Sequence, residues 1–75
     1  MKQGYQIMEE VVFLVTESEE GGYTARALGV DIFTEADTLP ELRTNIKDAV
    51  MCHFDDPKRP ALIRLHFVKE EYLTV

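Results

Sequence analysis

Acidic side chains are the most numerous groups in this sequence that can do chemistry, with 14 Asp and Glu residues against 8 Lys and Arg. Six of those between positions 31 and 56 are the candidate ligands for a magnesium ion: Asp31, Asp37, Glu41, Asp48, Asp55 and Asp56. Metal-assisted hydrolysis needs several carboxylates to converge, with an acid on a central strand among them. The apolar runs 11–15 and 62–68, which predict strands, contain no acid. We therefore predict no catalytic, metal or cofactor site, and a protein that is not an enzyme.

One cysteine and two histidines are the other reactive side chains, and no metal-ligand spacing connects Cys52, His53 and His66. We expect His53 to lie on the apolar stripe of a helix, near its last carbonyls. Cys52 is expected to be a small buried or boundary side chain. The roles of His53 and His66 stay open. A single cysteine rules out an internal disulfide, which is typical of a cytoplasmic protein.

The pair Gly21-Gly22 predicts a hairpin turn, because no helix and no Lys-Ser/Thr follow it as they would in a phosphate-binding loop. Three acidic residues precede the turn and form its tip: Glu17, Glu19 and Glu20. Such a charge run is either a solvated turn or a docking surface that speeds the encounter with a basic partner.

Four apolar runs predict the strands that must position these groups. The run 11–16 is β-branched and aromatic, as in a strand buried on both faces, and the alternating run 23–28 begins with Tyr23. The first two runs flank the glycine turn and form a hairpin. A short run at 32–35 predicts a third strand, and 62–68 a fourth with Ile63, Leu65 and Phe67 on its inner face.

A helix is predicted over 38–54. Thr38 and Glu41 have the spacing of a capping box, in which Glu41 reaches back to the amide of the cap residue. Asp37 precedes them, where the helix dipole favours negative charge. Apolar residues then recur on one stripe, and Pro57 stops the helix.

The element order predicts an α+β fold with two layers, β-β-β-α-β, in which a three-stranded antiparallel meander is followed by a helix and a returning strand. We expect one domain over 1–75 with its core at about 8–69. The tail 72–75 is either a further strand or a loose end, and the order of 1–10 and 70–75 stays open. Arg64, His66 and Tyr72 are candidates for a subunit interface.

The formal charge of −6 argues against nucleic acid and anionic membranes as direct partners. The longest apolar run, 11–15, is far shorter than the roughly 20 residues that span a bilayer, so we expect a soluble, cytoplasmic protein. A 75-residue chain leaves much of its surface uncovered, which favours a homo-oligomer, either a dimer or a tetramer.

Taken together, the pattern resembles the HicB-like family, which includes the antitoxins of HicA–HicB toxin–antitoxin pairs. Residues 19–25 match an "EGGY-x-A" hairpin, and residues 29–42 match a "G-C-x-T-x-G-D-T-x-x-E-A" pattern. Val30, Ala36 and Leu42 depart from the usual Cys, Gly and Ala. The resemblance covers about residues 11–53 and implies a partial ribonuclease H-like fold. It corresponds to the partner-binding half of such antitoxins, so the DNA-binding module and its operator binding are not carried over.

The resemblance implies a non-enzymatic module that binds and neutralises a small basic HicA-like RNA-cleaving toxin. The alternative is an orphan oligomeric scaffold or small-ligand-binding domain without a toxin. A third class, a nuclease, predicts RNA cleavage that depends on divalent metal, but the strand runs 11–15 and 62–68 contain no acid.

Overall fold

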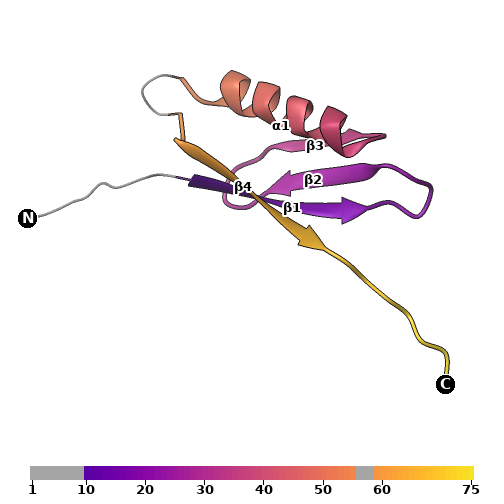
Figure 1. Ribbon diagram of the computed structural model, residues 1–75. Helices are drawn as coiled ribbons and strands as arrows, with labels where there is room; N and C mark the ends of the chain where they lie inside the picture. Colours follow the sequence, from indigo (N-terminus) through magenta and orange to yellow (C-terminus); the bar gives the residue numbers. More distant parts are fainter. Residues whose placement is uncertain (1–9, 56–58) are drawn as a thin grey trace, which may run out of the picture.

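The computed structural model describes residues 10–55 and 59–75, which form one helix against one sheet (Figure 1). The elements follow in the order β1 (Glu10–Glu17), β2 (Tyr23–Ala27), β3 (Phe33–Ala36), α1 (Leu39–His53) and β4 (Leu62–Val68). This confirms the α+β class and the β-β-β-α-β order. The third strand begins one residue later than expected, and the helix is flanked by the two cap residues at 38 and 54.

The four strands form one mixed sheet in the order β3-β2-β1-β4. The first three strands are the expected antiparallel meander, with Thr16 opposite Thr24 and Thr24 opposite Glu35. β4 returns to the other side of β1 and pairs with it in parallel, with Phe13 opposite Leu65. The connection through α1 therefore crosses the sheet from one edge strand to the other, as parallel pairing requires.

The core lies between α1 and the face of the sheet that α1 covers. Phe13 is fully buried there with Val15, and both pack with Leu42, Ile46 and Val50 of the helix. The helix residues are four apart, so they lie on one face of the helix. Burial of large side chains of this kind contributes roughly 1.5–3 kcal/mol each.

The expectation that β1 is buried on both faces is wrong. Its side chains alternate, so that Val11, Phe13 and Val15 are buried whereas Val12 and Leu14 are only half-buried. The reason is that α1 packs over β3 and β2 on a single face, and no described element covers the opposite face. We call that opposite face the open face of the sheet.

The structure describes the C-terminal tail but not the first nine residues. Residues 69–75 contain no helix or strand and run away from the sheet, so the tail is not a further strand (Figure 1). Residues 1–9 lie outside the described residues, as do 56–58, which include Pro57. The core was expected to start at about residue 8, which lies outside the described residues. The order of residues 1–9 stays open for the same reason.

Candidate functional site

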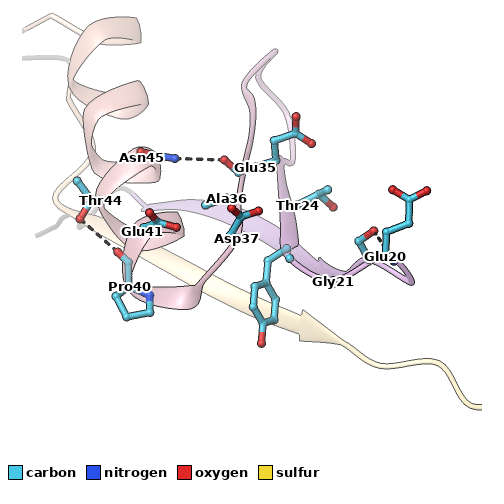
Figure 2. A pocket seen from close by; sticks show the side chains of 13 residues that line it. Glu20, Gly21, Thr24, Glu35, Ala36, Asp37, Pro40, Glu41, Thr44 and Asn45 are labelled. Carbon is cyan, nitrogen blue, oxygen red and sulfur yellow. Dashed lines mark hydrogen bonds between the residues drawn. The ribbon is translucent and has the colours of Figure 1, made fainter.

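A hollow of about 760 Å³ lies at the hairpin tip (Figure 2). We call it the acidic hollow. Three parts of the chain surround it, namely the β1–β2 turn with the start of β2, the end of β3, and the first turns of α1. Its lining residues are Ser18, Glu20, Gly21, Gly22, Tyr23, Thr24, Glu35, Ala36, Asp37, Pro40, Glu41, Thr44 and Asn45.

The turn at one side of the hollow is held by Ser18 and the two glycines. The amide of Ser18 donates to the carbonyl oxygen of Gly22 at 2.9 Å, and the amide of Gly21 donates to the carbonyl oxygen of Ser18 at 3.0 Å. Gly21 and Gly22 have φ of +95° and +86°, a backbone conformation that residues with a Cβ atom rarely adopt. A Cβ on Gly22 would lie 3.0 Å from the carbonyl oxygen of Ala36. Gly22 therefore allows the hairpin to approach the end of β3 closely.

The start of α1 forms the other side of the hollow. The amide of Glu41 donates to Thr38 Oγ1 at 3.3 Å, as expected for the cap. The carboxylate of Glu41 accepts a hydrogen bond from Thr38 Oγ1 at 3.2 Å, so it reaches the hydroxyl of the cap residue and not its amide as predicted. Further along α1, Asn45 Nδ2 donates to the carbonyl oxygen of Glu35 at 3.1 Å and ties the helix to β3 (Figure 2).

The hollow is acidic. Four of its lining residues carry carboxylates, Glu20, Glu35, Asp37 and Glu41, and none of the lining residues is Lys or Arg. Within residues 10–55 and 59–75, no three His, Cys, Asp or Glu side chains come together as a group able to hold a metal ion. Spread carboxylates of this kind attract cationic side chains over a broad surface instead.

The structure divides the predicted acidic tip between two places. Glu20 lines the acidic hollow, whereas Glu17 and Glu19 line a second, smaller hollow beside the end of β4 and the tail. All three residues are exposed. Tyr23 lines both hollows.

Asp37 and Glu41 were considered as magnesium ligands and then assigned to the start of the helix, and both also line the acidic hollow. Glu35 and Asn45 were missed. The register that places Thr24 opposite Glu35 brings β3 beside the hairpin. The one local signal for this part of the hollow was the apolar run that predicts the third strand, and the predicted strand begins one residue before the observed one.

The cysteine and the histidines do not form a site. Cys52 and His53 are both exposed, so the prediction of a small buried or boundary cysteine is wrong. His53 lies in the last turn of α1, as predicted, but its side chain is not covered there. The last turn of α1 lies beside the exposed start of β3, where both side chains line a shallow hollow. The imidazole ring of His53 packs edge-on against the ring of Phe54, with 4.8 Å between the two ring centroids. His66 is exposed on the open face of the sheet.

The other candidates for a subunit interface are exposed as well. Arg64 on β4 contacts Glu10 on β1, with 3.0 Å between Nη2 and Oε1. The hydroxyl of Tyr72 donates to the carboxylate of Glu70 in the tail at 3.4 Å.

No helix within the described residues is long and apolar enough to cross a membrane. The fold and the hollow together define a small two-layer α+β domain with a concave acidic surface at one end of its sheet.

The chain belongs to the family of UPF0150 proteins. It is 43% identical to a UPF0150 protein of Thermotoga maritima over 70 residues, which are 93% of this chain and 99% of that protein. It is 54% identical to a UPF0150 protein of Archaeoglobus fulgidus over 55 residues, which are 73% of this chain and 82% of that protein. No protein-family model matches the chain. No solved structure matches it either.

Proposed function

We propose that this protein is a non-enzymatic binding module of the HicB-like kind, which neutralises a small basic HicA-like RNA-cleaving toxin by covering its surface. The acidic hollow is the docking surface. A toxin of this class acts on cytoplasmic RNA, so the proposal also places the protein in the cytoplasm.

One observation carries the proposal: the residues that resemble the HicB-like family are the residues that build the hollow. The stretches 19–25 and 29–42 supply every lining residue except Ser18, Thr44 and Asn45. All four carboxylates of the hollow lie in them. The family resemblance and the acidic concave surface therefore coincide in the fold.

The charges suit a nuclease partner. An RNA-cleaving protein presents Lys and Arg to phosphates, and these side chains are the ones that a carboxylate-lined hollow attracts. Each exposed ion pair contributes only about 0.2–1 kcal/mol, so several pairs are needed for a stable complex. The main effect of the charge is on the rate of association, which falls as salt is added.

The first experiment is capture of partners from native extract at low salt, followed by identification of the bound proteins by mass spectrometry. We expect one small basic protein in stoichiometric amount, released by high salt. Recovery of the bait's own copies alone would contradict the proposal and favour the alternative of an orphan oligomeric scaffold.

A charge-matched pair of variants then tests the hollow itself. Glu20→Lys with Glu35→Lys reverses two carboxylates of the hollow, and Asp31→Lys with Asp48→Lys makes the same change in net charge outside it. The first variant should weaken binding of the captured protein about tenfold or more, and the second should leave it within about threefold. Equal losses in both variants would show that net charge alone attracts the partner and would refute the assignment to the hollow.

A further inference from the structure

The two edges of the sheet are protected unequally. β3 is four residues long, α1 packs beside it, and Asn45 Nδ2 bonds the carbonyl oxygen of Glu35. β4 is seven residues long, and β1 is its only neighbour among the described strands. Its sequence contains no Lys, Pro or Gly. Natural sheets use such residues, or short strands, to prevent an edge from pairing with another chain. The one charged residue of β4 is Arg64, and its side chain contacts Glu10 of the neighbouring β1, so the edge of β4 has little of this protection.

Both faces of β4 also leave apolar side chains uncovered. Ile63, Leu65 and Phe67 align with Val11, Phe13 and Val15 and therefore share the face that α1 covers. Phe67 is nevertheless 53% exposed, although Val15 beside it is 1% exposed. On the open face, Leu62 and Val68 are 41% and 37% exposed. The helix reaches β3 and β2 and stops short of covering β4.

We propose that β4 pairs in antiparallel orientation with β4 of a second copy of this chain, about a twofold axis at Leu65. This register is the one that pairs all of Leu62–Val68. It places Ile63 opposite Phe67 of the partner subunit on the helix side and Leu62 opposite Val68 of the partner subunit on the open face. Cross-strand apolar pairs of this kind stabilise sheets. The two four-stranded sheets become one continuous sheet with a closed, isologous interface.

Charge complementarity supports the same register beyond the strands. In a twofold pairing centred on residue 65, Glu71 of the tail comes opposite Arg59 of the partner subunit, and Glu70 lies next to that pair. The carboxylate of Glu71 therefore comes near the guanidinium of Arg59, which also donates to the carbonyl oxygen of Phe54 at 3.5 Å. Every other symmetric register shortens the ladder.

The tail also supplies contact area. A stable dimer buries roughly 800 Å² on each subunit, and a ladder of seven residues, about 23 Å long, is a narrow contact on its own. Tyr72 and Leu73 are 81% and 83% exposed in the single chain. Laid along the partner, the segment 69–75 extends the contact past the end of the ladder and covers these side chains. The proposal is independent of the toxin partner, because no residue of β4 or of the tail lines the acidic hollow.

Sedimentation equilibrium of the full chain and two matched variants tests the interface. We expect the unchanged chain to have twice the mass of 8.6 kDa at micromolar concentration. Phe67→Lys should weaken the dimer about tenfold or more. Phe33→Lys is the control, because Phe33 is 52% exposed on the opposite edge strand, and it should leave the dimer unchanged. A monomeric wild-type chain, or equal effects of the two variants, would overturn the proposal.

Cross-linking tests the register. In a Cys52→Ser background, which removes the one exposed native thiol, Leu65→Cys places two thiols at the twofold axis. Residues directly opposite in an antiparallel pair have Cβ atoms about 4.5–5.5 Å apart, so a short thiol-specific cross-linker should link the dimer covalently. Leu28→Cys, at a position that is 51% exposed and outside β4, should stay unlinked. A dimer in which Leu28→Cys links and Leu65→Cys does not would refute the pairing.

Discussion

Glycine-to-alanine substitutions at the hairpin distinguish two free-energy costs, that of an unfavourable backbone conformation and that of a steric clash. Gly21 and Gly22 have nearly the same backbone conformation, with φ of +95° and +86°. A Cβ on Gly21 meets nothing within 4 Å, whereas a Cβ on Gly22 lies 3.0 Å from the carbonyl oxygen of Ala36. Alanine at either position is therefore destabilised by the positive φ. Only at position 22 does its Cβ also clash with the carbonyl oxygen of Ala36.

The magnitudes follow from these two terms. A non-glycine residue in the left-handed region costs roughly 1 kcal/mol, and forcing a methyl group against fixed backbone adds about 1 kcal/mol. We expect Gly21→Ala to lower the free energy of unfolding by about 1 kcal/mol and Gly22→Ala by about 2 kcal/mol. For a domain of this size, each kcal/mol lowers Tm by about 4–8 °C.

Urea and thermal unfolding followed by circular dichroism measure both values. Gly29→Ala is a second reference, since Gly29 has φ of +88° and nothing near its Cβ position. It should match Gly21→Ala. If Gly22→Ala unfolds no more readily than the other two variants, the close approach of the hairpin to β3 is refuted, and with it the shape of the acidic hollow.

Three further substitutions have expected outcomes in the same unfolding assay. Thr38→Ala removes the helix cap and should lower the free energy of unfolding by about 1 kcal/mol. Thr44→Ala should lower it by less than half of that, because the hydroxyl of Thr44 only donates to a carbonyl oxygen within the helix. Equal losses would contradict the role of Thr38 as the cap. Phe13→Ala should cost about 3–5 kcal/mol and leave the domain largely unfolded, while Phe33→Ala, at a half-exposed position over which Arg26 stacks, should cost about 1 kcal/mol or less; a small loss at Phe13 would contradict the described core. Arg64→Ala breaks an exposed ion pair and should change stability by less than about 1 kcal/mol, so a larger loss would indicate that the pair is buried, for instance in a dimer.

The sequence predicted the elements well because their signals are local. The capping pair Thr38 and Glu41 fixed the start of the helix, and two glycines between apolar runs identified the hairpin. The helix-facing residues of β4 also followed from alternation. These patterns depend on neighbours within a few positions, which is the range over which a sequence can be interpreted directly.

The exposed and long-range features were not predictable in the same way. Helical periodicity placed His53 on the buried stripe, but whether a turn is covered depends on how far the neighbouring strand extends. The acidic hollow depends on the register of β2 against β3, and a shift of one residue changes which side chains line it. Glu35 was missed because no local pattern in the sequence specifies this register. The pairing of β1 with β4 joins residues at opposite ends of the chain, such as Glu10 and Leu62.

That last pairing has a consequence for how the protein is made. β1 lies inside the sheet, yet one of its two neighbours, β4, is synthesised only after β2, β3 and α1. A ribosome must therefore release residues up to Val68 before the sheet can be completed, and contacts so distant in sequence form slowly. Until then, the apolar stretch Val11–Val15 presents an unpaired side to other nascent chains, so it is prone to aggregation during translation.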